Sequence, residues 1–273
     1  ELPVSIDAAF VGVNRVATID IISQLSKAKC GGAVCFASGF SEAVSELKDG
    51  HELQETLINV AGKMPILGPN CYGIINYFDN FCLWPDQHGG RKVDSGVAVI
   101  TQSSNIMINL TMQKRGLPIG YAVTAGNQAQ LGLAELAMNI VKDDRVTALG
   151  LYVEGLGSIR NFEKLVSLCD RLGKAIVIIK IGKSEHAKVS AVSHTASLAG
   201  SDKGAAALMK RLGVARVDSL SEFIETLKIF HCHGRLSGPS VASVSCSGGE
   251  ASLIADISNS KQISFPKLTK TQI

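Results

Sequence analysis

The sequence predicts an α/β fold in which parallel sheets carry helices on both faces. Short apolar runs alternate with amphipathic stretches along nearly the whole chain, and glycine, serine and asparagine gather in the turns between them. Strands that alternate with helices of this length are typical of βαβ units, whose crossovers place helices over a parallel sheet. We find no short-period repeat and no low-complexity segment.

The first set of alternating elements occupies residues 6–70. Apolar runs predict strands, and the stretches that separate them have helical spacing. We expect strands at 6–13, 31–38 and 65–70, and helices at 17–30 and 51–63. The segment 78–96 shows no period and is rich in turn-forming residues, which is typical of a linker.

The second set begins at residue 96, and a third begins at 240 with a strand, a glycine turn and a helix through 258. In the second set we expect strands at 96–102, 119–126, 146–155, 175–182 and 214–217, and helices at 104–116, 129–142, 159–173, 202–213 and 219–232. The chain enters its first strand without a methionine and ends at Ile273, soon after the third set begins. We therefore expect it to be a piece of a longer polypeptide.

Composition excludes several classes of protein. The 273 residues are 46% hydrophobic and 19% charged, as in globular proteins, and a net charge of +3 is too small to indicate nucleic-acid binding or membrane-surface binding. No apolar run reaches the length of about 18 residues that a membrane-spanning helix needs. The seven cysteines show no paired spacing, which indicates reduced thiols in a cytoplasmic protein.

The turns that follow the expected strands are the expected place for function. Ligands of open α/β sheets bind beyond the carboxyl ends of the strands, where backbone N–H groups approach phosphate or carboxylate groups closely. None of the turns matches the dinucleotide-binding or P-loop glycine patterns, and each taken singly is typical of a tight connection. The eight turns are "VGVN", "FASGF", "GPNCYG", "TQSSN", "TAGNQ", "VEG", "IGKS" and "SCSGG".

Two of these turns carry candidate groups for anion chemistry. Ser103, Ser104 and Asn105 stand at the start of an expected helix, where capping side chains and the helix dipole favour an anion; the alternative is an ordinary N-cap. Glu154 ends an apolar strand, where its carboxylate is either solvated or the partner of a cation or an imidazole. The pattern by itself does not choose between these readings.

Other candidates have weaker support from the sequence. A lone cysteine such as Cys71 is more often an apolar filler than a nucleophile. His231, Cys232 and His233 are adjacent on an expected helix and so point in different directions, and no Cys/His cluster has the spacing of metal ligands. Lys180 and Lys183 either hold phosphate or solvate a turn.

His194 lies in "AVSHTASLAGSD", a stretch of small hydroxyl, alanine and glycine residues. One interpretation is a polar residue on a loop before a helix. The other is a nucleophile, because neutral imidazole attacks phosphoryl groups near neutral pH and small neighbours let a bulky group reach the ring or let the loop swing. A phosphorylated ring needs N–H donors for the phosphate and an acceptor at its other nitrogen; Glu154 is our candidate acceptor.

The chain resembles the NDP-forming acyl-CoA synthetases, which are related to the succinyl-CoA synthetase α-subunit. The matching stretches occur in the family's order over nearly the whole chain: "SGFSE", "GPNCYG", "TQSSNIM", "TAGNQ", "LYVEG", "KIGKS", "SHTASLAGSD" and "SCSGGEASLIAD". The resemblance implies three parts. Residues 1–94 are the later part of a Rossmann-like CoA-binding domain, 95–235 are a flavodoxin-like three-layer domain with the phosphohistidine, and 236–273 begin a second flavodoxin-like domain.

The resemblance also implies roles for individual residues. His194 matches the phosphorylated histidine, Glu154 the glutamate that holds it, and the turn with Ser103, Ser104 and Asn105 the phosphate seat. The positions matching turns that contact CoA are Val13, Asn14, Ala37, Ser38 and Gly39, with Asn70 and Cys71 near its thiol end. The family often has two glycines where this chain has Ser104 and Asn105, which leaves the substrate class open.

The implied reaction ligates a small carboxylic acid to CoA with ATP, through an acyl phosphate and a phosphohistidine. We expect the ATP/ADP site with Mg²⁺ on an ATP-grasp domain or subunit outside this segment, a homo- or hetero-oligomer, and no resident metal, nucleic acid or membrane partner. The first alternative is a CoA-sensing regulatory region of a protein lysine acetyltransferase without ligase activity. A nucleotide-binding dehydrogenase and a non-catalytic assembly subunit are the others.

Overall fold

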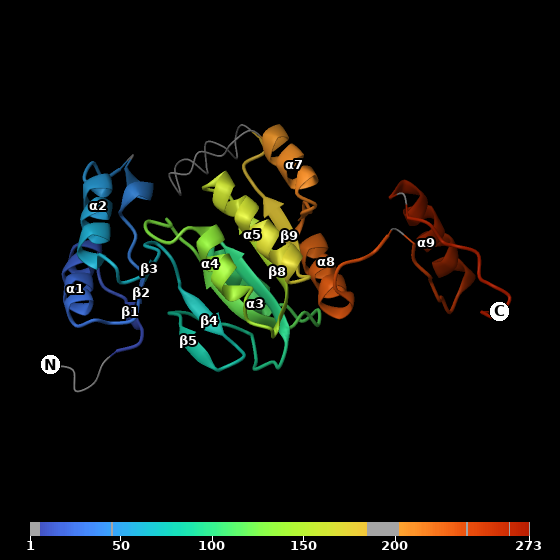
Figure 1. The fold of residues 1–273 in the computed structure, drawn as a ribbon, viewed down its shortest axis with the longest axis horizontal. Coiled ribbons are helices and arrows are strands. Elements are labelled where there is room, and N and C mark those ends of the chain that lie inside the picture. Colours follow the sequence, from blue (N-terminus) through green and yellow to red (C-terminus); the bar gives the residue numbers. More distant parts are fainter. Residues whose placement is uncertain (1–5, 45, 185–201, 239, 262, 273) are drawn as a thin grey trace. The chain divides into compact units, whose positions relative to one another are not determined.

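The structure, a computed structural model, describes residues 6–44, 46–184, 202–238, 240–261 and 263–272 (Figure 1). Contacts divide the chain into two compact units, Glu1–Gly234 and Arg235–Ile273. The first unit contains a three-stranded sheet and a seven-stranded sheet. The expected alternation of strands and helices is therefore confirmed in the described part of this unit.

The three-stranded sheet is parallel, with strand order β1-β2-β3. Its elements are β1 (Ala9–Val11), α1 (Arg15–Lys27), β2 (Ala33–Cys35), the 3₁₀-helix η1 (Ser41–Ala43), α2 (Gly50–Ala61) and β3 (Ile66–Leu67). Asn14 begins α1 because its side chain accepts hydrogen bonds from the N–H groups of Val16 and Ala17. Apolar residues of α1 and α2, such as Ile22 and Leu57, share one core cluster with the strands.

The seven-stranded sheet has the order β10-β9-β8-β6-β7-β4-β5. Its strands are β4 (Ile74–Asn76), β5 (Phe81–Leu83), β6 (Gly96–Thr101), β7 (Ile119–Thr124), β8 (Val146–Val153), β9 (Ala175–Lys180) and β10 (Ala215–Arg216). Strands β6 to β10 are mutually parallel, and every residue of β6 and β9 is buried. Continuous burial follows from helices on both faces, which is why these strands are apolar throughout instead of alternating.

Helices cover the two faces of this sheet, as expected. They are α3 (Ser104–Met112), α4 (Leu133–Ile140), α5 (Ile159–Arg171), α7 (Asp202–Arg211) and α8 (Leu220–His233). Val99 and Val177 pack with α3 and α8 in one cluster, whereas Ile100 and Ile178 pack with α4, α5 and α7 in the other. Successive strand residues point to opposite faces, so one apolar run supplies both cores.

The expected linker at 78–96 is partly wrong, because it contains β5, and β4 before it was not predicted. The two strands form an antiparallel pair, and β4 also pairs antiparallel with β7. Both strands stand among turn-forming residues, such as Asn76, Asp79 and Asn80, which mask them in the sequence. Residues 1–94 thus contribute strands to both sheets, and Phe10 and Val34 of the small sheet pack into the same cluster as Ile74 and Leu83.

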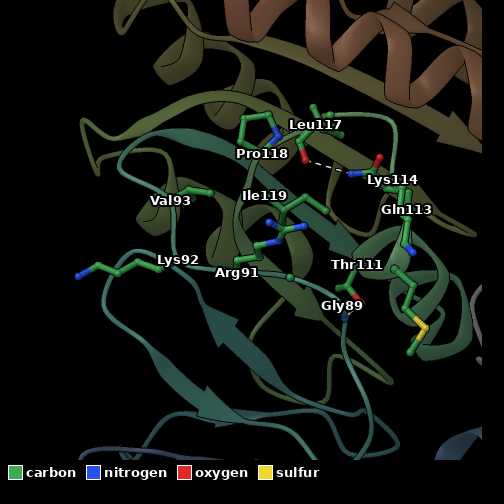
Figure 2. A pocket seen from close by; sticks show the side chains of 13 residues that line it. Gly89, Arg91, Lys92, Val93, Thr111, Gln113, Lys114, Leu117, Pro118 and Ile119 are labelled. Carbon is green, nitrogen blue, oxygen red and sulfur yellow. Dashed lines mark hydrogen bonds between the residues drawn. The ribbon is translucent and has the colours of Figure 1, made fainter.

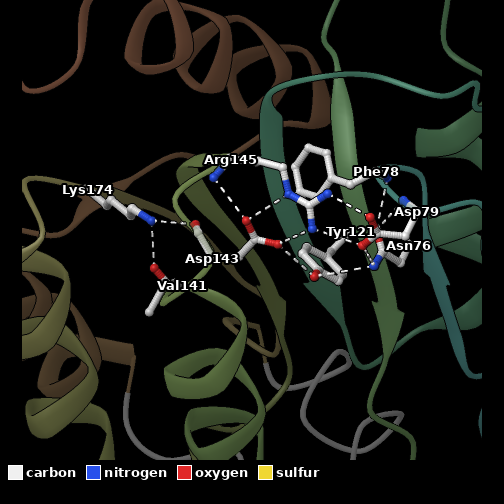
Figure 3. A network of polar contacts seen from close by, with 8 residues as sticks. All are labelled: Asn76, Phe78, Asp79, Tyr121, Val141, Asp143, Arg145 and Lys174. Carbon is white, nitrogen blue, oxygen red and sulfur yellow. Dashed lines mark hydrogen bonds and ion pairs between the residues drawn. The ribbon is translucent and has the colours of Figure 1, made fainter.

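A polar network links the turn between β4 and β5 to the start of β8 (Figure 3). The guanidinium of Arg145 forms ion pairs with Asp79, at 2.7 Å, and with Asp143, at 2.8 Å, and lies over the ring of Phe78. Tyr121 donates a hydrogen bond to Asp143. These groups lie at what we call the amino edge, where the parallel strands β6 to β10 begin.

The second unit contains helix α9 (Gly248–Ser260), capped by the hydroxyl of Ser247. The strand expected from residue 240 appears only as an isolated bridge between Ser240 and Ser264. Many apolar side chains of this unit are exposed, among them Val244, Leu253 and Phe265.

Candidate functional site

The carboxyl edge of the seven-stranded sheet, where β6 to β10 end, brings the predicted turns together. Thr101 at the end of β6 lies opposite Thr124 of β7 and Tyr152 of β8. Val153 lies opposite Lys180 at the end of β9. The turns "TQSSN", "TAGNQ", "VEG" and "IGKS" therefore leave the sheet side by side, as the parallel arrangement predicts.

Gln102 joins two of these turns. Its side-chain Nε2 donates to the carbonyl of Gly155 at 3.0 Å, and its Oε1 accepts from the N–H groups of Gly155, at 3.1 Å, and Glu154. Both Gln102 and Glu154 are buried, at 7% and 8% exposure. The amide of Gln102 thus fixes the backbone from which the Glu154 carboxylate projects. Sequence reasoning missed Gln102, although a polar residue between a buried strand and a helix cap is a usable signal.

The turn after Gln102 begins helix α3. The hydroxyl of Ser103 accepts from the N–H of Ile106, and Thr101 Oγ1 donates to the Ser103 carbonyl at 2.7 Å. The Ser103 hydroxyl therefore acts as the N-cap, one of the two readings left open by the sequence. Ser104 is half-buried and Asn105 is exposed, so both are at the surface of the helix N-terminus. A phosphate-binding site at the N-terminus of α3 stays a prediction.

A lysine ends β9 at the same edge. Lys180 is 2% exposed, and its Nζ donates to the carbonyl of Ile181 at 2.6 Å. Burial lowers the pKa of Lys180, while the charges of Asp202 and Glu154 act in the opposite direction. Glu154 also adds to burial in raising the pKa of Tyr152. The Glu154 carboxylate is therefore close enough to affect the pKa of both Lys180 and Tyr152. This proximity bears on whether the carboxylate is solvated or has a partner.

The neighbouring charges are paired. Lys183 forms an ion pair with Asp218, and Arg216 forms one with Asp202, the first residue of α7. Lys183 is therefore committed to a surface ion pair. The predicted nucleophile, His194, lies outside the described residues. The described residues on either side of that segment, Ser184 and Asp202, follow β9 and open α7.

The residues predicted to contact CoA lie at the carboxyl ends of β1 and β2. Val13, Asn14 and Ser38 are exposed, whereas Ala37 and Gly39 are buried. Arg15 ties these two turns together: it donates to the Gly39 carbonyl at 2.8 Å and pairs with Asp49 at 2.8 Å, which lowers the pKa of Asp49. An exposed turn with backbone groups at its surface is compatible with a CoA contact, and that contact stays a prediction.

The turn "GPNCYG" connects the two sheets. The N–H of Asn70 donates to the Ala37 carbonyl at 2.8 Å, and the N–H of Asn127 donates to the Pro69 carbonyl at 2.9 Å. Gly126, with φ of +55°, permits this approach, since a Cβ there would lie 2.2 Å from the Pro69 oxygen. The turns "FASGF", "GPNCYG" and "TAGNQ" thus form one junction between the small sheet and the carboxyl edge.

Polar side chains reinforce that junction. The buried Glu42 accepts from the Gly39 N–H at 2.6 Å and from Asn127 Nδ2, which also donates to Gln54. Asn70 Nδ2 donates to Asn127 Oδ1 at 3.4 Å. Asn70 is therefore part of the junction between the two sheets. Sequence reasoning missed Glu42 and Asn127 as partners because they are 85 positions apart.

Cys71 does not present a reactive thiol. It is 1% exposed and packs in the main core cluster, and burial raises its pKa above the ordinary value. A thiol that stays protonated is a poor nucleophile, so the filler reading of Cys71 fits its surroundings. Because the side chain of Cys71 is buried in the core, it cannot contact a ligand at the surface unless the core moves. Its backbone is therefore the part that could lie near the thiol of a bound CoA.

A pocket of about 810 Å³ lies away from these turns (Figure 2). It is lined by residues at the end of α3 and before β7, including Thr111, Leu117 and Pro118, with Arg91 reaching toward Ile119 and Lys92 pointing away. These residues belong to the amino edge, so the pocket is not part of the candidate site. Within the described residues no group of three or more His, Cys, Asp or Glu is arranged to hold a metal ion, and no helix is long and apolar enough to cross a membrane.

Comparisons with known proteins agree with this geometry. Residues 94–230 match the family described as succinyl-CoA ligase like flavodoxin domain. A trans-feruloyl-CoA synthase from an unknown prokaryotic organism is 31% identical over 263 residues, covering 94% of this chain and 37% of that protein. A 4-hydroxybutyrate–CoA ligase (ADP-forming) of Nitrosopumilus maritimus is 26% identical, covering 98% of this chain and 39% of that protein.

A solved structure gives the same result. The dinucleotide forming acetyl-coenzyme A synthetase 1 of Ca. Korarchaeum cryptofilum, in complex with phosphate and ADP, superposes with a TM-score of 0.84 at 26% identity, over 99% of this chain and 58% of that chain. The present chain thus spans well under two thirds of the length of each of these proteins.

Proposed function

Because the chain belongs to the family that carries the succinyl-CoA ligase-like flavodoxin domain, we propose that it is the CoA-binding and phosphohistidine part of an ADP-forming acyl-CoA synthetase. The observation that carries the proposal is the buried Glu154, whose backbone Gln102 fixes directly beside the N-terminus of α3. A carboxylate and a helix N-terminus at one sheet edge are what a phosphorylated imidazole requires.

The proposed chemistry has two transfers. An oxygen of the substrate carboxylate attacks the phosphorus of phosphorylated His194, the N–P bond breaks, and an acyl phosphate forms. The CoA thiolate then attacks the acyl carbon, the C–O bond to phosphate breaks, and inorganic phosphate leaves. Glu154 accepts a hydrogen bond from the other ring nitrogen of His194, which fixes the tautomer and stabilises the imidazolium-like charge.

The remaining groups position the reactants. Free N–H groups at the start of α3, with Ser104 and Asn105 at its surface, receive the phosphoryl oxygens. CoA lies over the turns at Val13, Asn14 and Ser38, with its thiol directed to the junction near Asn70. The hydrogen bond from the Asn70 N–H to the Ala37 carbonyl, at 2.8 Å, supports this, because it holds the junction turn beside the turn after β2.

The ATP/ADP site with Mg²⁺ belongs, in this proposal, to an ATP-grasp domain or subunit elsewhere in the full protein, as the greater length of the relatives supports. His194 then carries the phosphoryl group between the two sites. Residues 236–273 begin a second flavodoxin-like domain, and the exposed apolar side chains of this unit support a continuing core. A cytoplasmic location fits the seven free cysteines.

The test uses the full-length protein and ATP, followed by mass spectrometry under alkaline conditions that preserve phosphohistidine. We expect an acid-labile phosphate on His194, and thioester formation when a panel of carboxylic acids is supplied with CoA and ATP. CoA binding with no phosphohistidine and no thioester would instead support the CoA-sensing regulatory region.

A further inference from the structure

Four aromatic side chains form a continuous row that runs from the small sheet to the end of β5. The ring centroids of Phe10 and Phe36 are 5.9 Å apart, those of Phe36 and Tyr72 5.6 Å, and those of Tyr72 and Trp84 5.3 Å. These residues, which we call the aromatic row, come from β1, the turn after β2, the turn "GPNCYG" and the residue after β5. Only folding brings them together.

The aromatic row lies beside the groups that carry the proposed reaction. The N–H of Tyr72 donates to Thr124 Oγ1 at 2.9 Å, and Thr124 lies opposite Thr101, two residues before Ser103. Phe36, the neighbour of Tyr72 in the row, directly precedes Ala37 and Ser38, which are proposed to contact CoA. A carboxylic acid that meets both the phosphoryl group and the thiol must therefore bind close to this row.

The aromatic row also offers contact surface and an unused donor. Phe36 is 37% exposed, and Tyr72 and Trp84 are half-buried. Within the described residues, Trp84 Nε1 is a buried polar atom with no hydrogen-bond partner. A buried N–H without an acceptor is unfavourable, and tryptophan in such a place usually has a partner. An oxygen atom of a bound molecule would supply one.

We infer that the acid substrate is a planar aryl acid whose ring packs against the aromatic row and carries an oxygen substituent that accepts from Trp84 Nε1. This inference rests on the proposed ligase function and names its substrate class. Flat apolar rings gain both buried area and favourable edge contacts from aromatic neighbours. A two-carbon acid would leave the row and the indole N–H without contacts.

The experiment compares three variants of the full-length protein with 4-hydroxycinnamate, cinnamate and acetate as probes. Trp84→Leu removes the ring, and Trp84→Phe keeps a ring but removes the N–H. Phe81→Leu is the matched control, because Phe81 lies on β5 near Trp84 in sequence, is 38% exposed and is not in the row. Binding is measured by calorimetry and thioester formation by turnover, with thermal melts to establish that each variant is folded.

We expect Trp84→Leu to lower kcat/KM for both cinnamates by about tenfold or more, mainly through KM, and to leave acetate turnover nearly unchanged. Trp84→Phe should weaken binding of 4-hydroxycinnamate by about three- to tenfold and leave cinnamate binding nearly unchanged, because only the first acid uses the N–H. Phe81→Leu should resemble the unmodified protein for all three acids.

The outcomes separate this inference from the proposed function. Turnover of acetate without binding of either cinnamate overturns the aryl-acid inference and leaves the ligase function intact. Equal losses for all three acids in Trp84→Leu also overturn it, because a purely structural tryptophan would act that way. Trp84-dependent binding of cinnamates without thioester formation from any acid overturns the ligase function and supports the aryl site.

Discussion

Charged side chains have different surroundings at the two edges of the seven-stranded sheet. At the amino edge, Arg145 is paired with Asp79 and Asp143, and Lys174 donates to two backbone carbonyls. At the carboxyl edge, Glu154 is buried beside helix α3, and the only hydrogen-bond partner of Lys180 among the described residues is the Ile181 carbonyl.

We interpret the amino edge as holding the fold and the carboxyl edge as the place of the proposed chemistry. Charges in a closed network of side chains already have their partners and gain little from a ligand. At the carboxyl edge, Glu154 and Lys180 are instead buried beside turns and a helix N-terminus, and buried charged groups in such places are often functional. Variants at each edge test this contrast.

The largest effect is expected from His194→Ala at the carboxyl edge. Removing the proposed nucleophile should lower thioester formation by about a thousandfold or more, because the phosphoryl group then has no imidazole to accept it. CoA affinity, measured by calorimetry on the full-length protein, should persist. An equal loss of CoA binding would count against the role assigned to this histidine.

Glu154→Gln is expected to have the next largest effect. The amide keeps the shape of the side chain but loses its charge, so phosphohistidine accumulation should fall by about a hundredfold. Alkaline mass spectrometry measures the phosphorylated fraction. Glu135→Gln, which changes a carboxylate on α4 bonded to Asn161, is the matched control. Normal phosphorylation of Glu154→Gln would remove this residue from the mechanism.

Gln102→Leu should have a smaller effect on turnover together with a loss of stability. It leaves two turn N–H groups without acceptors, at a cost of about 1–3 kcal/mol in the free energy of unfolding, and loosens the backbone of Glu154. We expect kcat to fall about tenfold or more. The control is Gln130→Leu, because Gln130 also bonds backbone groups, including the Ile66 N–H at 2.9 Å, but away from Glu154.

Denaturation and steady-state kinetics on both variants measure the two effects. Similar stability losses with a kcat loss only in Gln102→Leu would support a positioning role. Parallel losses of kcat in the two variants would mean that both glutamines act only through the fold.

The smallest effect on activity is expected from Arg145→Ala at the amino edge. Hydrogen bonding from Arg145 lowers the pKa of Asp143 to about 2. A lowered carboxyl pKa stabilises the folded state above the ordinary value of about 4, and that stabilisation is lost as pH falls toward 2. Denaturation midpoints between pH 7 and pH 2 should therefore depend less on pH in Arg145→Ala.

Turnover at neutral pH should be unchanged in this variant. A loss of activity at Arg145 that matched the loss at Gln102 would remove the distinction between the two edges.

Much of the fold could be predicted from the sequence, because β6, β8 and β9 are long, buried apolar runs and their helices are amphipathic. The β4–β5 pair could not, since its two short strands stand among turn-forming residues. In the site, Glu154 and the Ser103 cap are local features of a strand end and a helix start. Gln102 was missed because its partners, at 154 and 155, lie in the turn after β8, about 50 positions along the chain.

The sequence by itself determined most of the strand–helix order, the helix caps and the turns at which we expect function, because these follow from local hydrophobic spacing and capping chemistry. Only the tertiary structure decided which turns meet. It joined Gln102 to the Glu154 turn, buried Cys71, paired Lys183 with Asp218 and assembled the aromatic row from Phe10 to Trp84. Contacts between residues so far apart in the chain depend on sheet order and register, which local patterns do not encode.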